Sequence, residues 1–156
     1  MAAGATRILV IGIGNAYRRD DAVGLIIARR LKQEFRDQVQ VREESGEGVA
    51  LMDSWRNSDA VILLDAVQTG GMPGTVYRLD ARAAPIPAHF FRYSTHACGV
   101  AEAVELARAL DQLPPQLIIY GVEGGNFEAG AELTPSVEDA VSEIVERIRR
   151  DLDSLN

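Results

Sequence analysis

The sequence predicts an α/β fold in which helices cover both faces of a mostly parallel sheet. Its clearest strand segments are continuous apolar runs, which is typical of strands that are buried on both faces. Segments with apolar residues at helical spacing alternate with these runs along the chain. The chain has no internal repeat, low-complexity tract or linker, so we expect a single domain over residues 1–156.

The N-terminal half contains three predicted strands and two predicted helices. The β-branched run 7–13 predicts a buried strand that leads into a glycine-containing loop. The apolar stripe that follows predicts a helix to Phe35, with Asp20 or Asp21 as its N-cap. The other elements expected here are a weak strand at 38–42, a short helix through 51–55 and a clear buried strand at 60–65.

The C-terminal half begins with a strand that differs from the others. Residues 75–79 follow the preceding strand too closely for a helical crossover, so we expect them to pair antiparallel at one side of the sheet. Ser94 and Thr95 predict the cap of a long helix that continues to Leu110. The remaining elements are a strand at 117–122 and a final amphipathic helix that starts at Thr134 and Pro135.

The composition is that of an ordinary globular protein and argues against several partners. The formal charge of -7 disfavours nucleic acid and anionic membranes. Cys98 is the only cysteine, which favours a reducing compartment, and no apolar run is long enough for a signal peptide or a membrane span. We therefore expect a cytoplasmic protein. The absence of heptads and of an obvious apolar patch predicts a monomer.

Three polar features are expected at the carboxyl ends of strands, where the functional crevice of an open α/β sheet lies. Asn15 to Asp21 follow the first strand, Asp65 ends the central strand, and His96 precedes a helix. Two carboxylates and one imidazole that converge there would form a mixed oxygen and nitrogen metal site. Such a site suits a borderline divalent ion such as nickel or zinc.

Each of these residues also has a purely structural interpretation. Asp20 and Asp21 would both serve as caps at a helix N-terminus, and Asp65 would serve equally to hydrogen-bond a turn. A lone histidine such as His96 is more often packed or capping than a ligand. Cys98 is two residues beyond His96, and side chains two apart on a helix face different ways, so we interpret it as a buried thiol rather than a nucleophile.

The glycines after the first strand suggest a dinucleotide site only weakly. The segment Gly12-Ile13-Gly14-Asn15 lacks the third glycine of the Rossmann fingerprint at the required spacing. No acidic residue ends the second strand cleanly, although Glu43 and Glu44 come near. Taken alone, these features indicate an α/β domain with a candidate metal site.

Four motifs in order along the chain resemble those of the hydrogenase maturation endopeptidases. The first is Gly12-Ile-Gly-Asn15 followed by Arg19-Asp20-Asp21-Ala-Val-Gly24, and the second is Leu64-Asp65-Ala66-Val67 with Gly71-Met-Pro-Gly74-Thr75. The third is Ser94-Thr-His96-Ala-Cys-Gly99-Val-Ala-Glu, and the fourth joins Tyr120-Gly-Val-Glu123 to Leu133-Thr-Pro135-Ser-Val137. Together they cover nearly the whole chain.

The resemblance implies a three-layer α/β/α sandwich around a twisted, mostly parallel sheet of about five strands. It also implies an endopeptidase that removes the C-terminal extension of a nickel-loaded hydrogenase large-subunit precursor. The family's metal-contacting positions correspond to Asp21, Asp65 and His96. Many members have Glu at the first of these, and Asp is shorter by one methylene. Nickel would be held by the precursor, and the isolated enzyme would bind it, or another divalent ion, only weakly.

Two parts of this interpretation stay open. Asp20 is a candidate for the group that positions or deprotonates the attacking water. It is a weaker candidate for a functional role than the three ligands. The family's glycine-rich loop after the second strand usually begins with Asp, whereas this chain has Glu43-Glu44-Ser45-Gly46-Glu47-Gly48. The alternatives to a peptidase are a nickel-carrying accessory protein and a nucleoside- or nucleotide-handling enzyme on a similar fold.

Overall fold

The computed structural model describes residues 4–87, 90 and 99–155, and contains a five-stranded sheet with the order β2-β1-β3-β5-β4. The strands are β1 (Ile8–Ile13), β2 (Gln40–Glu44), β3 (Ala60–Val67), β4 (Val76–Asp80) and β5 (Gln116–Glu123). The helices are the 3₁₀ helix η1 (Arg19–Ala22) and the α-helices α1 (Val23–Glu34), α2 (Gly48–Ser54), α3 (Val100–Ala109) and α4 (Pro135–Leu155). The predicted α/β class and strand number are confirmed.

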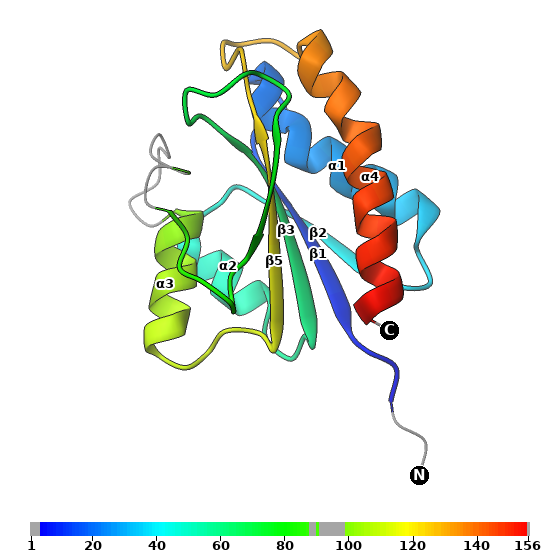
Figure 1. Cartoon of the computed structure of the whole chain (residues 1–156), viewed down its shortest axis with the longest axis vertical. Coiled ribbons are helices and arrows are strands. Elements are labelled where there is room, and N and C mark those ends of the chain that lie inside the picture. The colour runs from blue at the N-terminus through cyan, green and yellow to red at the C-terminus, as the bar shows by residue number, and fades with distance from the viewer. Residues whose placement is uncertain (1–3, 88–89, 91–98, 156) are drawn as a thin grey trace.

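The sheet is parallel except at one edge. β1 pairs in parallel with β2 and β3, and β3 pairs in parallel with β5. β4 pairs antiparallel with β5, as its short connection to β3 predicted. The parallel strands therefore end together at one edge of the sheet, where α1 and α4 begin (Figure 1).

Helices cover both faces of the sheet and enclose two hydrophobic cores. Helices α1 and α4 lie on one face, and α2 and α3 lie on the other (Figure 1). Successive residues of a strand point to opposite faces, so β3 divides its side chains between the cores. Ile62 and Leu64 pack toward α1 and α4, while Leu63 and Val67 pack toward α2 and α3.

The start of α1 differs from the prediction. Its N-cap is Ala22, which makes no side-chain capping bond, and Asp20 and Asp21 lie within η1. The predicted aspartate cap is therefore wrong, because a 3₁₀ turn precedes the α-helix and directs both carboxylates elsewhere. Helix α3 begins at Val100, where the Glu102 carboxylate accepts a bond of 3.1 Å from the Gly99 N–H. The predicted cap at residues 94–95 lies outside the described residues.

Close packing explains a glycine in β1 and a glycine in α1. A Cβ built on Gly12 would lie 2.6 Å from the Cβ of Ala28, and one on Gly24 would lie 2.3 Å from the carbonyl oxygen of Leu64. Helix α1 thus passes so close to β1 and β3 that neither glycine leaves room for a side chain. Over the described residues, no helix is both long and apolar enough to cross a membrane.

Replacing Gly24 by alanine should destabilise the fold by at least about 2 kcal/mol, because the new methyl group would overlap backbone that cannot move freely. Chemical denaturation followed by circular dichroism would measure the change. Gly4→Ala is the matched control, because no atom lies within 4 Å of a Cβ built there. Equal stability of the two variants would contradict the packing argument.

Candidate functional site

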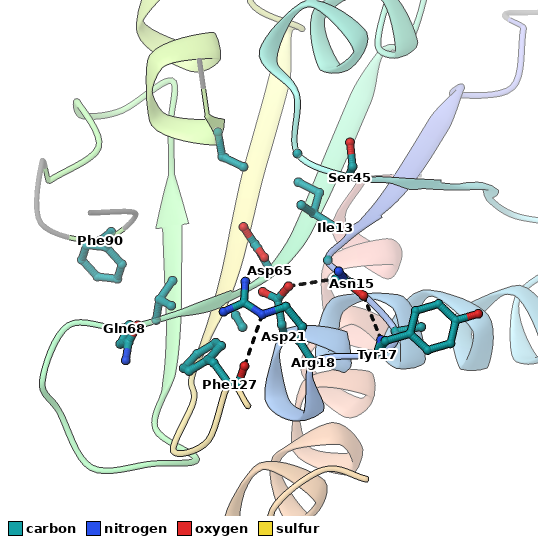
Figure 2. A pocket seen from close by; sticks show the side chains of 16 residues that line it. Ile13, Asn15, Tyr17, Arg18, Asp21, Ser45, Asp65, Gln68, Phe90 and Phe127 are labelled. Atoms are coloured by element: carbon teal, nitrogen blue, oxygen red, sulfur yellow. Dashed lines mark hydrogen bonds between the residues drawn. The ribbon is translucent and has the colours of Figure 1, made fainter. Parts of the chain in front are cut away.

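A cavity of about 600 Å³ lies at the edge of the sheet where β1 and β3 end. Its walls come from the loop after β1, the loop after β2, the end of β3 and the loop after β5. Figure 2 shows the side chains that surround it. The lining residues are Ile13, Gly14, Asn15, Ala16, Tyr17, Arg18, Asp21, Ser45, Gly46, Asp65, Ala66, Val67, Gln68, Phe90, Val100 and Phe127.

Asp21 and Asp65 meet in this cavity, as the strand-end argument predicted. The backbone N–H of Asn15 donates a bond of 3.1 Å to Oδ2 of Asp21, which fixes the carboxylate above the end of β1 (Figure 2). Asp65 lies two residues before the end of β3 rather than at its end. It shares the face of Leu63 and Val67, the face that α3 covers.

Burial raises the pKa of Asp65 well above its usual range. Loss of hydration disfavours the charged form most, and the neighbouring Asp21 carboxylate raises the pKa further. A hydrogen bond from the Ala66 N–H opposes these two effects. The site therefore holds two carboxylates close enough to repel each other, and that arrangement favours a proton or a cation between them.

Asp20 lies outside this cavity. It is fully buried, and its carboxylate accepts bonds from the backbone N–H groups of Gly125, Asn126 and Thr134 at 2.8–2.9 Å. The hydroxyl of Thr134 donates to the same carboxylate. These contacts do not fit the prediction that Asp20 positions the attacking water, because its oxygens already hold the loop between β5 and α4.

A second buried carboxylate, Glu123, was not singled out from the sequence. It accepts bonds from the N–H of Thr69 at 2.8 Å, the N–H of Gly71 at 3.2 Å and the hydroxyl of Tyr77 at 3.1 Å. The Thr69 hydroxyl also donates to it. Glu123 thereby holds the loop between β3 and β4. Its position as an acidic residue at the end of an apolar strand is the pattern that could have indicated Glu123 from the sequence.

Arg18 is a further site residue that the sequence analysis missed. Its Nε–H donates to the carbonyl oxygen of Phe127 at 3.2 Å, and its guanidinium projects toward the cavity that Asp21 and Asp65 line (Figure 2). It immediately precedes the Arg19-Asp20-Asp21 segment of the first motif. Nothing in the helical or strand periodicity distinguishes it from an ordinary solvated arginine.

The acidic segment 43–48 contributes no carboxylate to the lining of the cavity among the described residues. Ser45 and Gly46 line the cavity. Glu43 instead pairs with Arg29 of α1 at 2.7 Å, and Glu44 accepts a bond of 2.7 Å from the hydroxyl of Ser54. The departure from the family's usual sequence therefore leaves these two charges outside the cavity.

The third predicted ligand, His96, lies outside the described residues. Within the part of the chain that the structure describes, no group of three or more His, Cys, Asp or Glu residues is placed to hold a metal ion. Phe90 and Val100, which flank His96 in the sequence, both line the cavity. Asp21 and Asp65 thus lie in one cavity, and the metal site stays a prediction.

Replacing Asp65 by asparagine should stabilise the protein at pH 7. An aspartate whose pKa is higher in the folded state loses stability as pH rises from the unfolded pKa through the folded one. Each unit of difference corresponds to about 1.4 kcal/mol, or a few degrees in Tm. Thermal unfolding from pH 3 to pH 8 should show a gain that disappears at the acidic end. The exposed Asp139→Asn should show no such gain.

Replacing Asp20 by alanine should cost roughly 3 kcal/mol, because three buried N–H groups lose their acceptor. Denaturant titration would measure the loss, with the exposed Asp37→Ala as the control. A stability close to that of the control would contradict the anchoring role of Asp20.

The chain is similar to proteins of known activity over almost its full length. The family model described as hydrogenase maturation protease matches residues 25–151. The hydrogenase 2 maturation protease of Escherichia coli K12 is 32% identical over 146 residues, which cover 91% of this chain and 88% of that protein. The solved structure of the hydrogenase maturating endopeptidase HybD from E. coli superimposes with a TM-score of 0.79 at 27% identity, over 96% of this chain and 93% of that one. A solution structure of an endopeptidase from E. coli gives a TM-score of 0.79 at 31% identity, over 92% and 90%. The chain therefore belongs to the hydrogenase maturation proteases and is a peptidase.

Proposed function

We propose that this peptidase removes the C-terminal extension from the large-subunit precursor of a nickel-iron hydrogenase after nickel has been inserted. The observation that carries the proposal is the pair of carboxylates, Asp21 and Asp65, in a cavity of about 600 Å³ in a member of the hydrogenase maturation protease family. A cavity of this size accommodates an extended peptide segment with a bound ion. The reaction takes place in the cytoplasm, which fits a chain with one cysteine.

In this proposal the nickel belongs to the substrate and serves as the recognition element. Asp21 and Asp65 offer two oxygen ligands, and His96 offers an imidazole nitrogen. Phe90 and Val100 line the same cavity and bracket His96 in the sequence, which supports that assignment. Ligands on the precursor complete the coordination, so an unloaded precursor docks poorly. The protease thereby checks for metal before cleavage becomes irreversible.

The carboxylates also suit the hydrolytic step. Asp65 lines the cavity, where its carboxylate is placed to accept a proton from water. Water adds to the scissile carbonyl carbon while its proton passes to a carboxylate. The C–N bond then breaks, and the nitrogen of the departing peptide takes up a proton. Asp20 takes no part, because its oxygens hold the loop after β5.

Two alternatives make different demands on the site. A nickel carrier would bind the ion tightly by itself, whereas two described carboxylates and one predicted imidazole leave coordination positions open for ligands of a partner. A nucleotide-handling enzyme would need a phosphate cradle. Here Gly12 packs closely against α1 and Gly14 against the backbone of Asp21, and the carboxylates of Asp21 and Asp65 would repel phosphate.

Cleavage of a cognate large-subunit precursor should require both nickel and the carboxylate pair. The wild-type protein should release a short C-terminal peptide from the nickel-loaded precursor and leave the unloaded one intact. Asp21→Ala, Asp65→Ala and His96→Ala should each slow cleavage by at least about 100-fold. Gel shift and mass spectrometry would measure the products, with Asp37→Ala as a charge-matched control.

Normal cleavage by both Asp21→Ala and His96→Ala would contradict the recognition of nickel by these residues. Failure of the wild-type protein to cleave a demonstrably loaded cognate precursor would contradict the proposed reaction itself. Tight nickel binding by the isolated protein would instead favour the carrier, and a thermal shift with nucleotide alone would favour the nucleotide enzyme.

A further inference from the structure

We propose that Arg18 binds a carboxylate of the substrate peptide and so helps to select which extension is cleaved. This inference rests on the proposed function, because it concerns the peptide that occupies the same cavity. It assigns to Arg18 a specificity role that is separate from the carboxylate pair.

The backbone holds Arg18 at a defined place on the rim of the cavity. Its N–H donates to the carbonyl oxygen of Asn15 at 3.3 Å, and its own carbonyl accepts a bond of 3.0 Å from Asp21. The residue also forms an isolated bridge with Gly130. These contacts tie Arg18 to the segment that carries Asp21 and to the loop after β5.

The side chain is fixed at one end and available at the other. The Nε–H donates to the carbonyl oxygen of Phe127 at 3.2 Å, which directs the guanidinium toward the cavity (Figure 2). The two terminal nitrogens of the guanidinium take no part in that bond. Their planar arrangement suits a bidentate contact with a carboxylate.

The charges around the cavity point to an anionic group on the peptide. Arg18 is the single cation among the described lining residues, which otherwise carry the negative charges of Asp21 and Asp65. In the proposed function, a metal ion on the substrate binds the two carboxylates. The Arg18 guanidinium then remains to bind a negatively charged group of the same substrate. Tyr17 extends the same rim and is 80% exposed, and an exposed aromatic side chain beside an arginine is typical of contact surfaces.

The partner carboxylate has two sources on a C-terminal extension, namely an acidic side chain and the terminal carboxylate. Both present two oxygens to the guanidinium, so both fit the same contact. A contact away from the scissile bond is made in the ground state as well as in the transition state. Its loss should therefore raise KM and leave kcat nearly unchanged.

A double-mutant cycle between enzyme and substrate would test the contact. Wild-type protein, Arg18→Gln and Arg18→Lys would each be assayed on three forms of a nickel-loaded precursor that the wild-type protein cleaves. The three forms have the native extension, an extension with every Asp and Glu changed to Asn and Gln, and an amidated C-terminus. Arg36→Gln is the matched control, because Arg36 is exposed and precedes β2, at the opposite end of that strand from the cavity.

On the native extension, Arg18→Gln should lower kcat/KM on the order of tenfold through KM, and Arg18→Lys should lower it less. On the form that lacks the contacted carboxylate, the wild-type protein should fall to the same rate and Arg18→Gln should cause no further loss. High salt should weaken the wild-type preference. One modified substrate should abolish the difference in kcat/KM between the wild-type protein and Arg18→Gln. That substrate identifies whether the carboxylate bound by Arg18 belongs to an acidic side chain or to the C-terminus.

Equal losses by Arg18→Gln on all three substrates would overturn the proposal and leave Arg18 as a group that only offsets the charge of Asp21 and Asp65. A loss by Arg36→Gln as large as that by Arg18→Gln would overturn it as well. Because the wild-type protein must first cleave the native precursor, failure of the peptidase proposal would appear before any variant is compared.

Discussion

The buried carboxylate of Asp20 joins the two loops on which the cavity depends. It lies in η1, after β1, and its hydrogen-bond donors lie more than a hundred residues later, between β5 and α4. The adjacent Arg19 adopts a left-handed conformation with φ of 44°, which the bond from its N–H to Gly130 helps to hold. That bend lets Asp20 point into the protein while Asp21 points into the cavity. The same anchor places the Phe127 carbonyl where it can accept the Arg18 bond.

Glu123, the last residue of β5, performs the corresponding task for the loop between β3 and β4. Its oxygens gather N–H and hydroxyl groups from the loop after β3, much as Asp20 gathers them from the loop after β5. Burial of a carboxylate is costly unless donors replace its hydration, and both residues have such donors. These loops near the strand ends are thus held by polar interactions in addition to apolar packing, which Phe127 and Leu133 provide for the loop after β5. The two cores remain beneath them, against the faces of the sheet.

The element order was predictable because it depends on local patterns, whereas the roles of the acidic residues were not. Continuous apolar runs predicted the strands β1, β3 and β5, and the short connection before β4 predicted its antiparallel pairing. Asp20 resembled a helix cap because its true partners are distant in sequence. Glu123 and Arg18 gave no periodic signal, since their importance comes from which loops meet at the strand ends. Asp21 and Asp65 meet in the cavity, as their positions near the carboxyl ends of β1 and β3 predicted, while the position of His96 stays a prediction.

The strand order also constrains how the chain is assembled during synthesis. β5 lies between β3 and β4 in the sheet but follows both in the sequence. When β4 emerges from the ribosome, its only neighbour in the sheet has not yet been made, and one edge of β3 is likewise open. Helix α4, the last element, then covers the face shared with α1. The nascent chain therefore carries exposed strand edges until residue 123 is available, and such edges are open to wrong pairing.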